Sequence, residues 1–504
     1  MIRKLLLILL VALPASARVT VPEGALKGWN VVLITLDATN PKRIATYGGN
    51  PAVMPYLDSL AKQSLVMEHA YCTTGSTAPS HATMMTGVLP HRHRVFYNGL
   101  PLAPKVWWLP EELQKRGYVT AASTIAFFMG KAYDFDRGWN TFVAATTEQT
   151  PIGSNAGARK LFSEPLASLA NRKGPFFAWV HLKGGHAPLV PIDKKHLSLF
   201  APNASGDKLP AKYDEELANA TERRDVEQKW LKYYDANLHE ADVQLKALLD
   251  SFRAAGLTKN TLFVILADHG ESFDHGILDE HWPSPWESTL RIPMLFYAET
   301  PGMPKGRIND RLVMTTDLTP TLLYLLGIKD GPQESDGQNI FGANARQTFN
   351  AASASSIAYE DFEVQALKLS SDTSDSAKST MNKLRFDAGE LERTGIFYWA
   401  YVKRMPDGHI YKLVHFGSSK KRALAGGPGA VQLYDIGADP AEVRDLVSEQ
   451  RTIASSLLRE ARTNLPLFGR LGAVEGMTTA NPAAMTQGLD KEAIEKLKAL
   501  GYLH

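Results

Sequence analysis

The stretch Asn-Val-Val-Leu-Ile-Thr-Leu-Asp at residues 30–37 decides the expected fold. Residues 31–36 are rich in Val, Leu and Ile and lack the apolar–polar alternation of a half-exposed strand, so they predict a strand that is buried on both faces. Residues 176–180 and residues 262–266 have the same character. All three runs end in polar residues, so the sequence predicts three central strands that are each followed by chemically active side chains.

Helical patterns lie between the predicted strands, at residues 55–64, 109–116 and 229–255, and Gly117 closes the second of them. Apolar residues recur in these segments at helical spacing. Strands that alternate with helices predict an α/β fold with a doubly wound, mostly parallel sheet. Short strand-like pieces at residues 395–402 and 409–416 predict a smaller C-terminal α+β subdomain with an antiparallel sheet.

Ligands of a doubly wound sheet bind at the carboxyl ends of its strands. Asp37 follows the first predicted strand, His181 follows the second, and Asp268 and His269 follow the third. We therefore expect these side chains to converge from distant parts of the sequence, at a site that binds metal or substrate.

The length of 504 residues predicts more than one domain, since domains average roughly 150 residues. With 44% hydrophobic and 21% charged residues, the composition is that of a globular protein. A segment rich in Gly, Asp and Gln at residues 329–342 predicts a boundary near residue 330. The expected division is a signal peptide at 1–17, a catalytic α/β domain at 28–330, the C-terminal subdomain at 331–460, and a tail with a terminal helix at 461–504.

The N-terminal residues predict export. Arg3 and Lys4 precede an apolar run at residues 5–13, and Ala15-Ser16-Ala17 is typical of a cleavage site. The run is about half the roughly 20 residues that a membrane span needs, and no later stretch reaches that length. We interpret it as a signal peptide of a periplasmic or secreted protein, with an uncleaved N-terminal anchor as the alternative.

The charge balance and the cysteine content exclude several classes of protein. Lys and Arg number 55 against 53 Asp and Glu, which leaves a formal charge of +2 and gives no reason to expect nucleic acid or an anionic membrane as a partner. Cys72 is the single cysteine, so no intrachain disulfide can form. A small buried side chain is the favoured role for Cys72, and a nucleophile is the alternative.

The segment Thr-Thr-Gly-Ser-Thr-Ala-Pro-Ser-His at residues 73–81 combines hydroxyl side chains with the start of a helix. Pro79 suits a first helical turn, and the free N–H groups at a helix N-terminus attract anions. A Thr or Ser hydroxyl at that place can attack an oxyanion ester when a metal lowers its effective pKa. The alternative is an ordinary set of capping hydroxyls.

These residues resemble the signature of the sulfatase family, which is Cys or Ser followed by x-Pro-Ser-Arg and then a short helix with Thr-Gly. The matching residues are Thr77-Ala78-Pro79-Ser80-His81 and Thr86-Gly87. Further similar segments follow in the family's order: residues 30–37, 90–95, 98–99, 186–188, 268–271, 287–293, 317–326, 433–435, 439–440 and 497–503. The chain is thus identified as a member of the sulfatase branch of the alkaline-phosphatase-like superfamily.

The resemblance implies roles for individual residues. Asp37, Asp268 and His269 fall on positions that bind one divalent metal ion, with Ca²⁺, Mg²⁺, Mn²⁺ and Zn²⁺ all left open. Thr77 falls on the nucleophile, His186 on a histidine that contacts the sulfate or the leaving oxygen, and His281 near a lysine that holds the anion. These three are the catalytic residues that the resemblance implies. Substrate-binding roles are implied for His81, His181 and His275.

Several residues depart from the family's pattern. Thr77 replaces the Cys or Ser that is oxidised to formylglycine, a reaction that a Thr cannot undergo. His81 replaces the Arg that holds the anion, and Ala38 replaces a second metal-binding Asp. Two-zinc relatives with a Thr nucleophile carry an Asp where this chain has Gly184-Gly185. These departures favour one metal ion and an unmodified Thr77, which acts by in-line displacement or by positioning water.

The leading functional hypothesis is an exported, metal-dependent hydrolase of sulfuric or phosphoric esters. The resemblance favours sulfuric esters, whereas a Thr nucleophile favours phosphoryl transfer. A phosphodiesterase or phosphoryl transferase is the first alternative. The second is a protein that binds an anion or a glycan without turnover.

Overall fold

The computed structural model describes residues 19–95, 98–145, 155–189, 193–204, 220–275, 284–342, 346–354, 397–415 and 431–464. The predicted signal peptide at residues 1–17 and the helix expected near the C-terminus lie outside the described residues, and so does His281.

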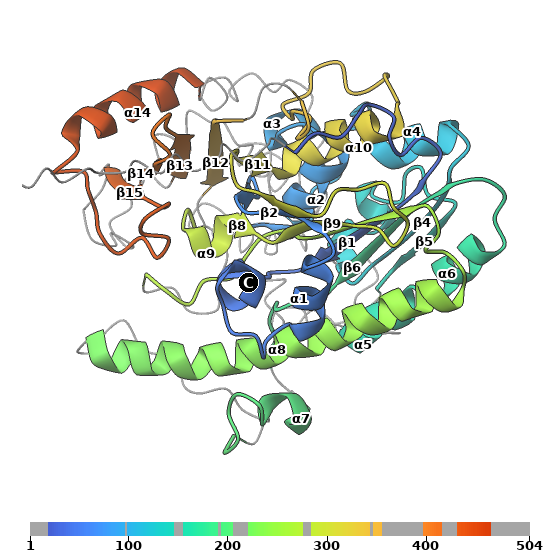
Figure 1. Ribbon diagram of the computed structural model, residues 1–504, viewed down its shortest axis with the longest axis horizontal. Helices are drawn as coiled ribbons and strands as arrows, with labels where there is room; N and C mark the ends of the chain where they lie inside the picture. The colour runs from blue at the N-terminus through green and yellow to red at the C-terminus, as the bar shows by residue number, and fades with distance from the viewer. Residues whose placement is uncertain are drawn as a thin grey trace, which may run out of the picture.

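An eight-stranded sheet forms the centre of the protein (Figure 1). Its strand order is β10 (Gly306–Ile308), β2 (Leu65–Met67), β9 (Met294–Tyr297), β7 (Thr261–Ala267), β1 (Asn30–Leu36), β6 (Phe176–Leu182), β4 (Val119–Thr124) and β5 (Thr141–Ala144). The five strands from β7 to β5 are parallel, and β9 is antiparallel to both of its neighbours. The predicted doubly wound, mostly parallel sheet is confirmed.

Side chains of the central strands alternate between two apolar cores, one on each face of the sheet. Val31 and Leu33 of β1 join one core, while Val32 and Ile34 join the other. The first core is covered by α2 (Thr77–Thr86), α4 (Leu109–Lys115) and α10 (Leu318–Leu326). The second is covered by α1 (Pro55–Ala61), α6 (Ser163–Ala170) and α8 (Ala220–Ala254), and α8 runs along the side opposite α4 and α10 in Figure 1. Both faces are buried, which is why the strands show no polar alternation.

The remaining elements of the large unit are short. A three-stranded sheet joins β11 (Val313–Met314), β3 (Ala70–Tyr71) and β8 (Arg291–Ile292). The short helices are α3 (Pro90–His93), α5 (Asn155–Leu161), α7 (Lys194–Leu197) and α9 (Glu287–Leu290), with 3₁₀ turns at Pro41–Arg43, Ala45–Tyr47, Phe127–Met129, Lys131–Tyr133 and Thr315–Asp317. Helix α8 begins at Ala220 rather than at residue 229, because the added residues favour helix without forming an apolar stripe.

The C-terminal part forms a separate antiparallel sheet, as the sequence predicts. Its strands are β12 (Thr348–Ala354), β13 (Phe397–Arg404), β14 (Ile410–His415) and β15 (Val431–Asp435), and α14 (Arg451–Asn464) packs on them through Leu457. A buried ion cluster links this sheet to α9, because Lys412 Nζ lies 3.1 Å from Glu287 Oε1 and 2.7 Å from Glu442 Oε1. The predicted domain boundaries stay a prediction.

None of the helices in the described ranges is long and apolar enough to cross a membrane.

Candidate active site

Three adjacent parallel strands bring the predicted polar residues to one edge of the sheet. Asp37 follows β1 directly and Asp268 follows β7 directly, so the register between these strands places the two carboxylates together. His181 lies inside β6, where it pairs with Thr35 of β1. All of these side chains are fully buried. Their proximity follows from the parallel topology, as expected from the sequence.

Thr77 is the first residue of α2, and the whole helix is buried. The backbone N–H of Ala78 and the Ser76 hydroxyl both donate to Asn98 Oδ1, over 2.8 and 3.2 Å, which fixes the start of the helix. Thr77 Oγ1 lies 3.3 Å from His269 Nε2. Pro79 is therefore the third helical residue, in the first turn as the sequence predicts, and the candidate nucleophile is the first residue of the helix.

The ring of His269 has a defined tautomer. Its Nδ1 lies 2.9 Å from the carbonyl oxygen of Gly270, and a carbonyl can only accept, so we assign the proton to Nδ1. In a neutral ring Nε2 then carries a lone pair. This atom lies 3.5 Å from Asp37 Oδ1 and 3.5 Å from Asp268 Oδ2. The His269 nitrogen and the two carboxylates together offer the kind of ligand atoms that bind a metal cation.

Most oxygens of the two carboxylates have no hydrogen-bond partner in the part of the chain that the structure describes. Asp268 Oδ1 accepts hydrogen bonds from the backbone N–H groups of Ala38 (3.1 Å) and His269 (2.8 Å). Within the described residues, Asp268 Oδ2 and both oxygens of Asp37 have no hydrogen-bond partner. Burial raises the pKa of Asp268 to about 7, and the charge of Asp37 adds to the effect. Buried carboxylates without partners are costly unless they bind a metal, so these residues fit a divalent ion.

The raised pKa of Asp268 predicts a pH-dependent metal affinity. Because the ion must displace the proton of Asp268, we expect affinity to fall about tenfold per pH unit below about pH 7. The same shift makes the metal-free protein lose stability as the pH rises from about 4 to about 7, since the folded state then holds a proton that the unfolded state has released. Calorimetric titration with Mn²⁺ or Zn²⁺ measures the affinity, and a constant affinity below pH 7 would contradict this reasoning.

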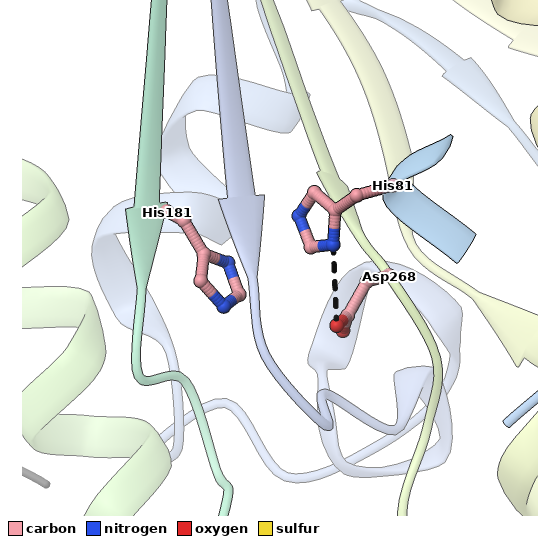
Figure 2. Close-up of side chains that lie close together, drawn as sticks. All are labelled: His81, His181 and Asp268. Carbon is pink, nitrogen blue, oxygen red and sulfur yellow. Dashed lines mark ion pairs between the residues drawn. The ribbon is translucent and has the colours of Figure 1, made fainter. Parts of the chain in front are cut away.

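His81 and His181 lie near the carboxylate of Asp268 (Figure 2). His81 Nδ1 is 3.8 Å from Asp268 Oδ2, and His181 Nε2 is 3.4 Å from Asp37 Oδ2. The two ring centroids are 4.5 Å apart. Burial lowers the pKa of His81 to about 3 and that of His181 to about 4, so both rings are neutral near pH 7. At the position of the family's arginine the chain thus carries a buried neutral ring.

Sequence reasoning missed Thr35, whose hydroxyl joins both rings. Thr35 Oγ1 lies 2.8 Å from His81 Nε2 and 3.0 Å from His181 Nδ1, and it accepts a hydrogen bond from Trp179 Nε1 over 3.1 Å. The available signal was a polar residue within the otherwise apolar run at residues 31–36.

The loop after β6, which carries His186, contacts the end of β1 through Gly185, whose N–H donates to the carbonyl oxygen of Asp37 over 2.9 Å. Its ring is buried, and Nδ1 lies 2.7 Å from the carbonyl oxygen of Ala187, which precedes Pro188 in a cis peptide bond. Gly184 has a φ of 58°, and a Cβ there would lie 2.0 Å from the backbone oxygen of Asp37. An Asp at residue 184 would clash with this backbone. The local structure is therefore consistent with the expectation that this chain lacks the carboxylate of two-zinc relatives.

Gly184→Ala is expected to lower both thermal stability and metal affinity, because the new Cβ displaces the backbone of Asp37. Gly408→Ala is a matched control, since Gly408 has a φ of 98° but no atom within 4 Å of an added Cβ. Both variants carry the strain of a positive φ, of order 1 kcal/mol. Thermal unfolding and metal titration compare them, and equal losses would show that the contact with Asp37 is unimportant.

The two remaining predicted histidines are His275 and His281. His275 stacks on Trp286, with ring centroids 3.8 Å apart, and burial lowers its pKa. His281 lies outside the described residues, so its role stays a prediction. Cys72 is buried, and burial raises the pKa of its thiol far above the ordinary value, which favours the structural role.

The fold and the site agree with one protein family. The sequence profile of the sulfatase family matches residues 29–328, more than half of the chain. The chain therefore belongs to the sulfatase family.

Relatives that are named as sulfatases are similar to this chain at low sequence identity. The chain is 26% identical over 319 residues to an ulvan-active sulfatase of Formosa agariphila, with 62% of this chain and 56% of that protein covered. It is 23% identical over 352 residues to an endo-4-O-sulfatase of Bacteroides thetaiotaomicron, with 58% and 66% covered. It is 24% identical over 353 residues to a choline-sulfatase of Rhizobium meliloti, with 59% and 68% covered. The matched region spans less than two thirds of the first two relatives.

Solved structures share the fold over most of the chain. A protein solved with its substrate D-glucosamine-2-N,6-O-disulfate superimposes with a TM-score of 0.65 and 16% identity, over 89% of this chain and 100% of that chain. The phosphonate monoester hydrolase of Agrobacterium radiobacter gives a TM-score of 0.60 and 18% identity, over 88% and 96%. At these identities the likeness establishes the fold.

Proposed function

We propose that the protein is a metal-dependent hydrolase of sulfate esters that uses the unmodified hydroxyl of Thr77 as its nucleophile. The observation that carries the proposal is the placement of Thr77 Oγ1, 3.3 Å from His269 Nε2, whose ring faces the buried carboxylates of Asp37 and Asp268. Three oxygens of these two carboxylates have no hydrogen-bond partner within the described residues. Membership of the sulfatase family supports the ester class.

Asp37, Asp268 and His269 would hold one divalent ion. Such an ion supplies positive charge that favours the deprotonated form of the Thr77 hydroxyl and polarises the bound ester. Zn²⁺ and Mn²⁺ accept both nitrogen and carboxylate ligands, whereas Ca²⁺ and Mg²⁺ prefer oxygen. Since His269 directs a lone pair at the site, the donor set favours Zn²⁺ or Mn²⁺.

Thr77 and His186 would divide the chemistry between nucleophile and acid. Thr77 Oγ1 attacks the sulfur in line with the ester bond, and the sulfur–oxygen bond to the organic group breaks as the new bond forms. His186 gives a proton to the leaving oxygen. Water then attacks the sulfur of the Thr77 ester, with the same histidine as its base, and releases sulfate and free enzyme.

The substrate class is proposed from the relatives. Ulvan is named for one relative, and a sulfated glucosamine is bound in one similar structure. We infer that the natural substrate is a sulfated saccharide, with His281 and His275 as further anion-binding residues. The second candidate is a phosphoric ester, which a Thr nucleophile favours.

Export is also part of the proposal. The residues that predict a signal peptide support it, and one relative, from Caenorhabditis elegans, is named a putative extracellular sulfatase.

Turnover of nitrophenyl sulfate, nitrophenyl phosphate and bis-nitrophenyl phosphate tests the proposal, with each of Mg²⁺, Ca²⁺, Mn²⁺ and Zn²⁺ and then with sulfated oligosaccharides. Faster metal-dependent cleavage of sulfate esters is expected. Preferential cleavage of either phosphate ester would favour the second candidate. No turnover on any substrate, combined with binding of sulfated oligosaccharides, would favour a protein that binds anions without catalysis.

A further inference from the structure

The buried pair of His81 and His181, whose side chains Figure 2 shows, has no task in the proposed reaction. The hydrogen bonds of the two rings nevertheless determine which nitrogen of each ring carries the proton. His81 Nδ1 lies 2.8 Å from the carbonyl oxygen of Thr77. A carbonyl oxygen only accepts, so His81 Nδ1 carries a proton. In the neutral ring, His81 Nε2 is then an acceptor.

The hydrogen bonds of Thr35 determine the protonation of the second ring, that of His181. Its single hydroxyl proton is donated to His81 Nε2, over 2.8 Å. Its oxygen accepts from Trp179 Nε1–H over 3.1 Å, and it has one more lone pair to offer. His181 Nδ1, 3.0 Å away, therefore donates to Thr35 and carries the proton of its ring.

His181 Nε2 is left with a lone pair that points at the carboxylates. It lies 3.4 Å from Asp37 Oδ2, and neither atom has a hydrogen-bond partner within the described residues. A lone pair beside a buried carboxylate oxygen is repulsive unless a proton or a metal cation lies between them, and a metal cation would serve both atoms at once. The second nitrogen of the ring is tied to an oxygen, as is usual for metal-binding histidines.

We propose that His181 Nε2 is a second imidazole ligand of the metal ion, and that His81 and Thr35 are positioning residues that fix its tautomer. This inference rests on the proposed function, because it completes the same metal site. The distances of 3.4 Å from His181 Nε2 to Asp37 Oδ2, and of 3.5 Å from His269 Nε2 to Asp37 Oδ1 and to Asp268 Oδ2, are each close to the roughly 3.4 Å between two ligands of a tetrahedral Zn²⁺ site with bonds of about 2.1 Å. Asp268 belongs both to the group of possible ligand atoms that includes His181 and to the group that includes His269.

The second imidazole changes the expected selectivity. A site with two nitrogen and two carboxylate ligands favours Zn²⁺ over Ca²⁺ and Mg²⁺. His181 thereby moves from the predicted substrate-binding role to the metal, while His81, whose two nitrogens are held by Thr77 and Thr35, does not bind the ion.

The test compares the full chain with His181→Asn. Asparagine can still hydrogen-bond to Thr35 but is too short to reach the place of Nε2. Zn²⁺ affinity is expected to fall at least about 100-fold, whereas Ca²⁺ affinity changes by less than about threefold. His409→Gln, at an exposed histidine of the C-terminal sheet, is the matched control and should bind both metals as the parent does.

Pulsed electron paramagnetic resonance of the Cu²⁺-loaded protein counts the bound imidazoles directly. Two are expected in the parent and in His409→Gln, and one in His181→Asn. Thr35→Val keeps the side-chain shape but removes the hydroxyl, so it should lower Zn²⁺ affinity about 10- to 100-fold without changing any ligand. The imidazole count in the parent and the Zn²⁺ affinity of Thr35→Val decide the question even if His181→Asn does not fold.

The outcomes separate this inference from the proposed function. One bound imidazole in the parent, with unchanged Zn²⁺ affinity in Thr35→Val, would overturn the role of His181 and leave the Thr77 hydrolase standing. A parent that binds no divalent metal but cleaves sulfate esters would overturn the metal site altogether. A loss of affinity for Zn²⁺ but not for Ca²⁺ in His181→Asn would support the inference.

Discussion

Thr77→Ala is expected to lower kcat by at least about 10³-fold while the purified protein keeps its metal ion. The variant removes the hydroxyl that lies 3.3 Å from His269 Nε2, but it leaves Asp37, Asp268 and the ring itself in place. Steady-state turnover of the best ester substrate and metal analysis of the same sample measure the two effects.

Thr77→Ser is the matched control, because serine keeps the hydroxyl at the first position of α2. It should retain at least about a tenth of the parent's kcat. Mass spectrometry of the parent should show an unmodified Thr77. Full activity in Thr77→Ala would assign the nucleophile elsewhere, with a positioned water as the first candidate.

The sequence sufficed to predict the sheet and part of the site because both depend on local patterns. Buried parallel strands leave uninterrupted apolar runs, and residues that follow such runs meet at one edge. Asp37, Asp268 and His181 were predicted to converge for this reason, and the structure brings them within a few ångströms. The antiparallel C-terminal sheet was likewise visible as short strand-like pieces.

The hydrogen-bond chain behind the carboxylates was not predictable in this way. Thr35 of β1 and His181 of β6 are paired in the register of the sheet, and only the packing of α2 over the sheet brings His81 to them. From a single Thr in an apolar strand, the local sequence does not predict which distant residues its hydroxyl will contact. The same holds for Gly184, whose need for a positive φ depends on the backbone of Asp37, far away in sequence.

The replacement of the family's arginine by His81 has an electrostatic consequence. An arginine stays charged in proteins and would offset the charge of Asp268. His81 is neutral near pH 7, because burial lowers its pKa to about 3. The two buried carboxylates therefore depend more strongly on a bound cation than they would beside an arginine.

Asp37→Asn is expected to weaken divalent-metal binding at least about 100-fold and to abolish turnover, since it removes a charged ligand from the centre of the site. Asp37 is also one of the causes that raise the pKa of Asp268. Without metal, the variant should therefore be more stable than the metal-free parent near pH 8, where two like charges are otherwise buried together. Thermal unfolding with and without a chelator measures both effects.

The unfolding temperatures measured with a chelator and with added Zn²⁺ decide whether Asp37 binds a metal ion. In the parent, a chelator should lower the unfolding temperature and added Zn²⁺ should raise it. In Asp37→Asn neither treatment should matter, and the chelator-treated variant should unfold above the chelator-treated parent. A variant that simply loses stability in both conditions would mean that Asp37 is held by protein contacts rather than by a metal ion, and the whole cation site would need a different explanation.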